Sequence, residues 1–201
     1  MAQWKILDRE QSYTFRSYFE LAYEPEDILA ELGYQLQQRV LCLPEVKVLP
    51  DRAHSLQEDI QDSLPWVSLT SETARREIFV APILLLVARH CRCPLRIEYP
   101  LTHNQWLKGH LDYFLRASQS FLVVEAKKED LTRGLTQLGA ELIAVAEHYD
   151  QERVYGAVTI GNVWQFAQID RANHTITQDL QLYALPQQFE ALLKILLGIL
   201  G

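Results

Sequence analysis

Two short apolar segments, residues 109–115 and 121–128, carry charged side chains where a buried strand would carry aliphatic ones. Side chains alternate faces along a strand, so Glu125 and Lys127 point the same way. A tight turn midway between the segments would set Asp112 directly opposite Glu125, with Cβ atoms roughly 4.5–5.5 Å apart. Two carboxylates so placed repel each other unless a positive charge lies between them, and a hard divalent cation would supply that charge. The pattern therefore predicts a metal site beside Lys127.

The alternative interpretation is an exposed hairpin face on which Lys127 is a simple ion-pair partner of the two acids. Surface ion pairs contribute only about 0–1 kcal/mol, so little would hold such a face together. The run Phe121-Leu122-Val123-Val124 is apolar at every position, which predicts a strand buried on both faces. A buried strand that ends in charge favours the metal site over the exposed hairpin.

The arrangement of Asp112, twelve intervening residues and Glu125-Ala126-Lys127 at the end of an apolar strand resembles the PD-(D/E)XK nuclease superfamily. More narrowly, it is similar to the nuclease domain at the start of type I restriction motor subunits. The similarity covers about residues 70–165. One departure is that the residue before the aspartate, proline in the superfamily's name, is Leu111 here. The resemblance implies an α/β fold with a restriction-endonuclease-like mixed central sheet flanked by helices.

The resemblance also assigns roles to single residues. The metal ligands would be Asp112, Glu125 and the backbone carbonyl of Ala126, and the metal would be Mg²⁺, with Mn²⁺ expected to substitute. Lys127 would orient the attacking water and stabilise negative charge on the phosphate. Mg²⁺ prefers oxygen ligands and can generate the nucleophile, stabilise charge at phosphorus and assist the leaving oxygen.

Two further residues are candidates for supporting roles. In the resembling domains a glutamate of the first helix reaches the site, and Glu77 is expected here because a double arginine precedes it, with Glu72 as the alternative. Gln137 occupies the place where several branches carry a glutamine that contacts DNA or a metal-bound water. The tyrosine that often follows four residues later is Glu141 here. For both Glu77 and Gln137 the competing interpretation is a solvated helix face.

Basic side chains near these positions are candidates for phosphate contacts, although a solvated helix face would look the same. His110 would lie opposite Lys127 in the hairpin. The candidate nucleic-acid-binding residues are Lys128, Arg133, Arg75, Arg76 and His110.

Charge argues against a nucleic-acid partner, since the 201-residue chain has a formal net charge of −7. Residues 1–71 hold 6 Lys/Arg and 12 Asp/Glu, whereas residues 72–201 hold 13 and 14, so the acidity lies in front of the expected site. The three cysteines have no framework spacing and are typical of a reducing cytosol. No apolar run approaches the roughly 20 residues of a membrane helix. These features predict a cytoplasmic protein without a membrane span.

The chain divides into an expected N-terminal extension, residues 1–70, mainly helical and packed on the core, and a nuclease core, residues 71–201. The extension would contain a helix from Pro25 to about Leu41 and a more polar helix over residues 51–64. The elements expected in the core are a helix over 72–90 kinked at Pro82, strands over 95–99, 109–115 and 121–128, a helix over 131–149, strands over 154–160, 163–169 and 180–185, and a helix over 189–197.

Taken together, the sequence predicts a magnesium-dependent nuclease that hydrolyses phosphodiester bonds, with DNA as the expected substrate and endonuclease action as the expected mode. The acidic N-terminal part would be the contact for a second copy or a protein partner. One alternative is a non-catalytic binding or scaffolding protein that retains the nuclease fold. A weaker alternative is a hydrolase of another phosphate ester, which requires the same metal site.

Overall fold

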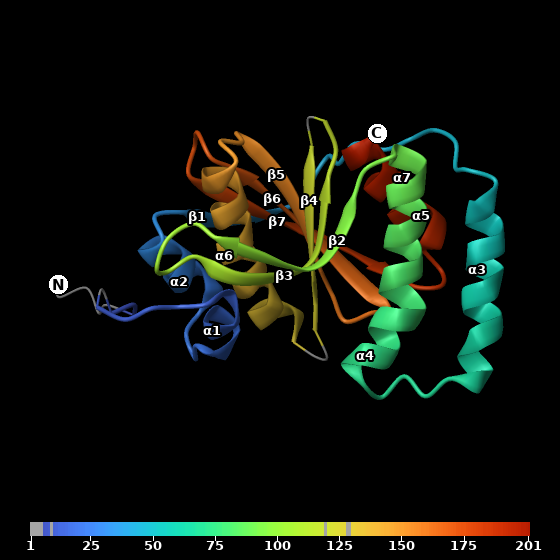
Figure 1. The fold of residues 1–201 in the computed structure, drawn as a ribbon, viewed down its shortest axis with the longest axis horizontal. Helices are drawn as coiled ribbons and strands as arrows, with labels where there is room; N and C mark the ends of the chain where they lie inside the picture. Colours follow the sequence, from blue (N-terminus) through green and yellow to red (C-terminus); the bar gives the residue numbers. More distant parts are fainter. Residues whose placement is uncertain (1–5, 9, 119, 128–129) are drawn as a thin grey trace.

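A seven-stranded mixed sheet runs through the molecule and carries helices on both faces (Figure 1). The structure is a computed structural model and describes residues 6–8, 10–118, 120–127 and 130–201. In chain order the elements are α1 (Phe15–Glu20), α2 (Pro25–Glu31), β1 (Gln35–Arg39), α3 (Arg52–Ser63), a 3₁₀ turn (Leu64–Trp66), α4 (Glu72–Arg75), a π-helical turn (Arg76–Val80), α5 (Ala81–Cys91), β2 (Leu95–Thr102), β3 (Lys108–Arg116), β4 (Phe121–Ala126), α6 (Leu131–His148), β5 (Arg153–Thr159), β6 (Val163–Asp170), β7 (Thr175–Ala184) and α7 (Phe189–Leu200). The predicted α/β class is therefore confirmed.

The strand order is β1-β7-β6-β5-β4-β3-β2. Two neighbouring pairs, β1 with β7 and β4 with β5, are parallel, and the others are antiparallel. One face is covered by α6 together with α1 and α2, and the other by α5 and α7, with α3 lying outside α5 (Figure 1). Each face has its own apolar core, so β4 in the middle is buried along its whole length, as its apolar run predicted.

The predicted helix from Pro25 to about Leu41 is wrong in its second half. Helix α2 stops at Glu31, where Gly33 adopts a left-handed backbone with φ of +87° that favours glycine. The chain then forms β1, whose residues pair in parallel with Thr175–Asp179 of β7. Backbone pairing at the sheet edge thus decides this segment, and the helical spacing of its apolar side chains does not. The N-terminal part is accordingly less helical than predicted and supplies a strand to the common sheet.

The predicted helix over 72–90 is confirmed as a continuous helical segment that contains one wide turn. Ser71 caps it, since its hydroxyl accepts the backbone N–H of Ala74 at 3.0 Å. Just before Pro82 the backbone N–H of Ala81 donates to the carbonyl of Arg76, five residues earlier, which makes a π-helical turn. The irregularity expected at Pro82 therefore falls one turn earlier and changes which side chains face the sheet.

The strands and helix predicted between residues 95 and 170 are confirmed to within a few residues, but the last strand is longer than predicted. Strand β7 begins at Thr175, five residues before the apolar pattern starts. The early part is polar and still buried, because its side chains bond to those of the neighbouring strands. Gln178 accepts a hydrogen bond from Gln38 of β1 at 2.9 Å and donates one to Gln165 of β6 at 3.0 Å.

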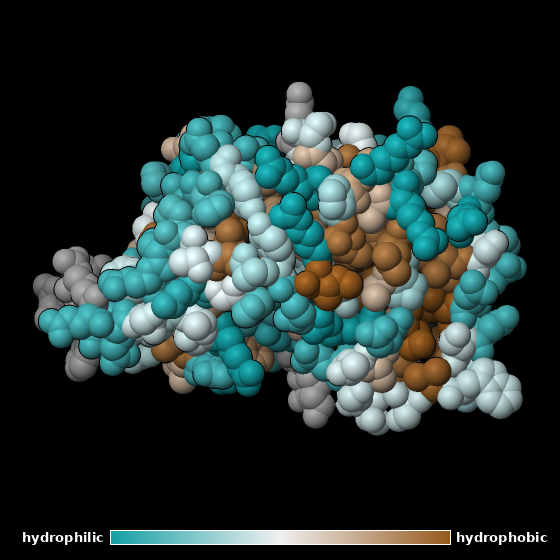
Figure 2. All heavy atoms as spheres, in the orientation of Figure 1, coloured by the Kyte–Doolittle hydropathy of each residue, from teal (hydrophilic) through white to brown (hydrophobic). Residues whose placement is uncertain are grey.

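A groove separates α3 from α5 on the outer side of the molecule, with a volume of about 780 Å³. Figure 2 shows hydrophobic atoms gathered between these two helices. Leu56 of α3 and Leu85 and Leu86 of α5 contribute to the lining, with Arg52 and Arg89 at its borders. We refer to it as the apolar groove.

Candidate active site

The pairing of β3 with β4 brings the two predicted acids together. Four consecutive pairs, from Arg116 with Phe121 to Tyr113 with Val124, fix the predicted register, and one further step sets Asp112 opposite Glu125. At that step the backbone N–H of Ala126 donates to Oδ2 of Asp112 at 2.9 Å. The Asp112 carboxylate thus accepts a hydrogen bond that a backbone carbonyl would accept in a regular β-ladder. The regular pairing of β3 with β4 therefore ends at Asp112 and Glu125.

Glu125 and Lys127 form a buried ion pair at the end of β4. The Glu125 side chain is 1% exposed and that of Lys127 15% exposed, and Nζ of Lys127 lies 2.5 Å from Oε1 of Glu125. The backbone N–H of Lys127 donates to the carbonyl of Thr159 in β5 at 2.7 Å, which fixes the chain after β4. Nζ also lies 4.7 Å from the ring centroid of Phe19. The ammonium is held between a carboxylate and an aromatic face.

Beneath this pair, helix α6 contributes Gln137 and Glu141, both buried. Nε2 of Gln137 donates to Oε1 of Glu125 and to Oε1 of Glu141, each at 2.8 Å. The remaining oxygens, Oε2 of both glutamates, receive no hydrogen bond from described residues. Sequence reasoning placed Gln137 at the site and missed Glu141. The available signal was the four-residue spacing of the two, which puts them on one helix face among alanines and leucines.

The two buried glutamates share protonation chemistry. Burial and the nearby charge of Asp112 raise the pKa of Glu125 to about 7. Burial and the charge of Glu125 raise the pKa of Glu141 well above its usual range. Both shifts favour the protonated form, because burial and a neighbouring like charge disfavour an ionised carboxyl.

Burial and neighbouring charges shift the pKa values of Lys127 and Asp112 upward, for different reasons. Burial opposes the ammonium form of Lys127, but the charge and hydrogen bond of Glu125 outweigh it and the pKa of Lys127 is raised. Burial raises the pKa of Asp112, against the opposing effects of the Ala126 N–H and the Arg76 guanidinium. A lysine with a raised pKa is a cation at neutral pH. It can orient a water or a phosphate but is not a base.

A third carboxylate borders Asp112 on its other side. Glu98 lies opposite Asp112 in the register of β2 with β3, where its backbone is left-handed with φ of +51°. Arg76 joins the two acids, with Nη2 3.0 Å from Glu98 Oε1 and Nη1 3.7 Å from Asp112 Oδ1, while its guanidinium covers the Tyr113 ring. Glu98 was not predicted, because its place depends on the β2–β3 register. Carboxylates therefore stand side by side on β2, β3 and β4, with Arg76 between the first two.

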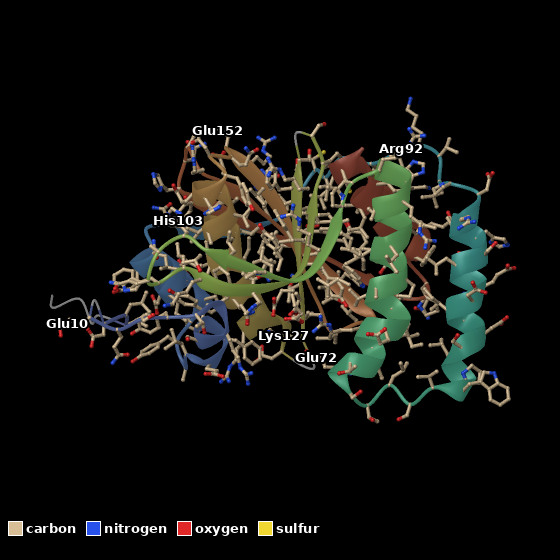
Figure 3. All side chains as sticks on the ribbon, viewed as in Figure 1. Glu10, Glu72, Arg92, His103, Lys127 and Glu152 are labelled. Atoms are coloured by element: carbon tan, nitrogen blue, oxygen red, sulfur yellow. The ribbon has the colours of Figure 1, made fainter. Side chains whose placement is uncertain are left out.

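These side chains open into a cleft of about 800 Å³. Helix α1 forms one wall, the start of α4 another, and the ends of β3 and β4 form the floor. Figure 3 labels Lys127 and Glu72 at this end of the sheet. The lining residues are Thr14, Arg16, Phe19, Glu20, Glu72, Glu98, Gly109, His110, Asp112, Glu125, Lys127, Asp130, Arg133 and Gln137. The predicted residues Asp112, Glu125, Lys127 and Gln137 are thus brought into one cleft.

Of the two candidate glutamates on the first helix, Glu72 lines the cleft and Glu77 does not. The Glu77 side chain is exposed. Glu72 and Arg76 are four residues apart and so share one helix face, whereas Glu77, next to Arg76, is turned about 100° away. The geometry therefore supports Glu72 in place of Glu77 as the helical carboxylate of the cleft.

The candidate phosphate-binding residues divide into three groups. His110 and Arg133 line the cleft. Arg133 also forms an ion pair with Asp130, the residue that caps α6, with Nε 3.4 Å from a carboxylate oxygen. Arg76 is engaged by carboxylates, and Arg75 packs against the turn between β5 and β6. Lys128 lies outside the described residues. Two of the five predicted residues are therefore open to a ligand in the cleft.

The carboxylates of the cleft can be compared with the ligands that Mg²⁺, the metal expected from the family resemblance, prefers. Among the residues that the structure describes, no three His, Cys, Asp or Glu side chains are arranged to hold a metal ion. Mg²⁺ commonly takes only one or two carboxylates and completes its shell with waters and phosphate oxygens. Asp112 and Glu125 are two hard oxygen donors, and the buried Oε2 of Glu125 has no hydrogen-bond partner within the described part of the chain. The acids present fit such a partial site.

Comparison with protein-family models, with curated proteins and with solved structures finds no match to this chain. The function proposed below rests on the sequence motif and the geometry of the cleft. Within the described residues, no helix combines the length and the apolar composition that crossing a membrane requires.

Proposed function

We propose that this chain is a metal-dependent nuclease with a restriction-endonuclease-like core, which hydrolyses phosphodiester bonds of DNA at the Asp112 cleft. The observation that carries the proposal is the junction of β3 and β4. There Asp112 opposes the buried Glu125, and Lys127 contacts Glu125 at the floor of an open cleft. An aspartate and a Glu-x-Lys motif on adjacent strands are the groups that the resembling nuclease superfamily uses for metal-assisted hydrolysis.

The arrangement of elements supports the proposed core. A helix leads into an antiparallel meander of β2, β3 and β4, and α6 then crosses to β5, which pairs in parallel with β4. The acids stand at one end of the central strands, and α6 packs directly beneath them with Gln137. This order of helix, three strands, helix and strand agrees with the family resemblance of the motif.

The protein groups have distinct tasks in the proposed hydrolysis. Lys127, kept cationic by Glu125, donates hydrogen bonds that orient the attacking water and balance the charge that grows on the phosphate. Gln137 holds the Glu125 carboxylate by donating to Oε1, which leaves Oε2 without a hydrogen-bond partner among the described residues. Arg76 holds Asp112 and offsets the repulsion among the row of acids.

Asp112, Glu125 and the carbonyl of Ala126 are the groups that would hold Mg²⁺, and Glu72 lines the same cleft. When bound, Mg²⁺ supplies a water of lowered pKa and positive charge for the phosphate and the leaving oxygen. The two carboxylates also make the site dependent on the cation, because their mutual repulsion is relieved when the charge is compensated.

A second candidate is a binding or scaffolding protein that keeps this fold without catalysis. The observation in its favour is charge. Acids outnumber Lys and Arg among the cleft residues, and the whole chain carries a net charge of −7. Nucleic-acid affinity depends strongly on neutralising phosphates with basic groups, and such groups are few here. This alternative predicts divalent-cation binding without strand cleavage.

The test is cleavage of a panel of plasmid, linear duplex, single-stranded and branched DNA in Mg²⁺ and in Mn²⁺. We expect wild-type protein to cleave at least one substrate, and Asp112→Ala and Lys127→Ala to reduce the rate by about 100-fold or more. Asp59→Ala, an exposed acid of the apolar groove, is the matched control and should retain full activity.

Circular dichroism and thermal melting would verify that each variant is folded. Cleavage that survives both cleft substitutions would assign the activity to a contaminant or to another site. No wild-type cleavage of any substrate, combined with saturable Mg²⁺ binding, would favour the scaffolding protein.

A further inference from the structure

Helix α1 is a fixed wall of the cleft. Its residues Phe15 and Tyr18 are buried, and the Tyr18 hydroxyl donates to the carbonyl of Trp106 at 2.7 Å. Strand β3 approaches this helix closely, since a Cβ on Gly109 would lie 2.9 Å from Cδ2 of Phe15. Gly109 has a φ of +147°, so both its backbone and its missing side chain allow the contact. The wall is therefore anchored to the strand that carries Asp112.

Phe19 is the aromatic side chain that this wall presents to the cleft. Phe19 comes directly after the buried Tyr18 in α1 and is half-buried. The centroid of its ring lies 4.7 Å from Nζ of Lys127. It is the one phenyl ring among the described residues that line the cleft, and its other lining neighbours are mostly charged or polar. An apolar ring beside the proposed catalytic lysine is an unusual lining for a site built only to hold ions.

The size and charge of the cleft restrict what can enter. Its volume of about 800 Å³ is that of a small-molecule site. It has room for about one or two nucleotides, so a base can enter it only when that base is not stacked and paired within a duplex. Acids also outnumber bases in the lining, so phosphate contacts contribute little affinity. Base stacking on an aromatic ring does not depend on that charge and accepts any sequence.

We propose that Phe19 stacks a nucleobase of the substrate next to the scissile phosphate, so that the strand entering the cleft is unpaired. The substrate class is then single-stranded DNA or an unpaired end of a duplex. This inference rests on the proposed nuclease function and adds a binding residue from α1, outside the segment that resembles the nuclease superfamily. Phe19 contacts the base through the part of its ring that Lys127 does not cover, and Lys127 contacts the adjacent phosphate.

The test is steady-state cleavage of a single-stranded oligonucleotide and of the blunt duplex of the same sequence, in Mg²⁺. Wild-type protein should favour the single strand by about ten-fold or more in kcat/KM. Phe19→Ala should raise KM for the single strand by about ten-fold and leave kcat within about three-fold, since loss of stacking weakens binding. Phe19→Trp should restore the KM, and Phe19→Leu, which keeps apolar packing without a π face, should not.

A single-stranded probe containing 2-aminopurine, bound in Ca²⁺, provides a readout besides turnover. Stacking on Phe19 should quench its fluorescence in wild type and in Phe19→Trp, and the quenching should be lost in Phe19→Ala. Tyr23→Ala, at an exposed aromatic outside the cleft, is the matched control and should behave as wild type.

Equal cleavage of single strand and blunt duplex, or an unchanged KM in Phe19→Ala, would overturn this inference and leave the nuclease function standing. A fall in kcat alone, with quenching unchanged, would likewise overturn it, because Phe19 would then only position Lys127. If wild type cleaves no DNA and the probe does not bind, the proposed function itself fails, a result that the substrate panel above reports independently.

Discussion

Among the described residues, the cleft and the apolar groove have nearly equal volumes, about 800 Å³ and about 780 Å³, but different side chains line them. The cleft lies where β3 and β4 stop pairing and is floored by buried charge. The groove lies between two helices, and leucines and prolines share its lining with exposed polar and charged side chains. Size alone therefore does not distinguish a site from a packing gap.

The difference lies in what each region must do to remain folded. The charged side chains of the groove are all exposed to solvent and so need no buried partner; they are Asp51, Arg52, Asp59 and Arg89. The cleft buries Glu125 and Glu141 completely, with Gln137 and Lys127 as their partners. Burying charge costs free energy unless it is paired and hydrogen-bonded, and a packed apolar core would be cheaper. Groups with perturbed pKa values in a cleft are typical of functional sites, which is why the cleft and not the groove is the candidate site.

The largest effect on stability should come from breaking that cluster at its centre. Gln137→Ala removes the donor shared by Glu125 and Glu141 and leaves both carboxyls short of a partner. We expect a loss of about 1–3 kcal/mol in the free energy of unfolding, measured by urea denaturation. Gln61→Ala, an exposed glutamine of α3, is the matched control and should stay within about 0.5 kcal/mol of wild type. Equal effects of the two substitutions would refute the buried network.

Protonation of the pair should make stability fall as pH rises. The folded pKa values of Glu125 and Glu141 are raised above the usual value of 4.5, so above that pH the unfolded chain binds fewer protons than the folded one. Folding then loses stability from about pH 4.5 upward through pH 7. Glu141→Gln keeps a side chain whose oxygen can accept from Gln137, and it removes the ionisable group at position 141.

We therefore expect Glu141→Gln to melt at least about 3 °C above wild type at pH 8, with the gap closing toward pH 5. Melting curves at several pH values measure the effect. Glu190→Gln, at an exposed position of α7, should follow the wild-type curve at every pH. A constant difference between Glu141→Gln and wild type across the pH range would show that Glu141 is already ionised.

The left-handed backbone at Glu98 provides a smaller test. Glycine adopts this conformation without the steric penalty of a side chain, so Glu98→Gly should be more stable than Glu98→Ala by about 1 kcal/mol. At Arg96, an exposed neighbour in the same strand with no such backbone, the order should reverse. At each position the glycine and alanine variants lose the same charge. The difference between them therefore reports the backbone conformation alone. Alanine equal to glycine at position 98 would contradict the strained conformation.

The smallest effects should come from the apolar groove. Leu85 is 43% exposed on α5, and Leu85→Gln replaces it with another good helix former. We expect a change within about 0.5 kcal/mol in unfolding free energy and an unchanged cleavage rate. A marked loss of activity in this variant would mean that the groove, and not only the cleft, takes part in function.

Several parts of the fold and of the site could be read from the sequence because local patterns decide them. The hairpin register followed from the apolar runs on both sides of the turn, which is why Asp112 and Glu125 were placed opposite each other correctly. The cap at Ser71 and the extent of α6 were likewise local. Periodicity and turn position contain this information without knowledge of the tertiary fold.

Other parts could not be read, because they depend on contacts between distant segments. Residues 35–39 form β1 because they pair with β7. The partners are far apart in sequence, since Gln38 and its partner Gln178 are 140 residues apart. Glu98 reached the acids through the β2–β3 register and a left-handed backbone, neither of which its neighbours signal. Glu72 replaced Glu77 through the helix face that packs toward the sheet. Glu141 looked like a departure from a motif and proved to be part of the buried cluster.

The most direct test of the account is divalent-cation binding, since the central claim is that the cleft acids form a metal site and the groove acids do not. Electron paramagnetic resonance of Mn²⁺ titrated with protein should report saturable binding to wild type, displaced by Mg²⁺. Asp112→Asn should weaken that binding by at least about ten-fold, whereas Asp59→Asn in the groove should leave it unchanged. Binding that is absent in wild type, or equal in wild type and Asp112→Asn, would contradict the claim.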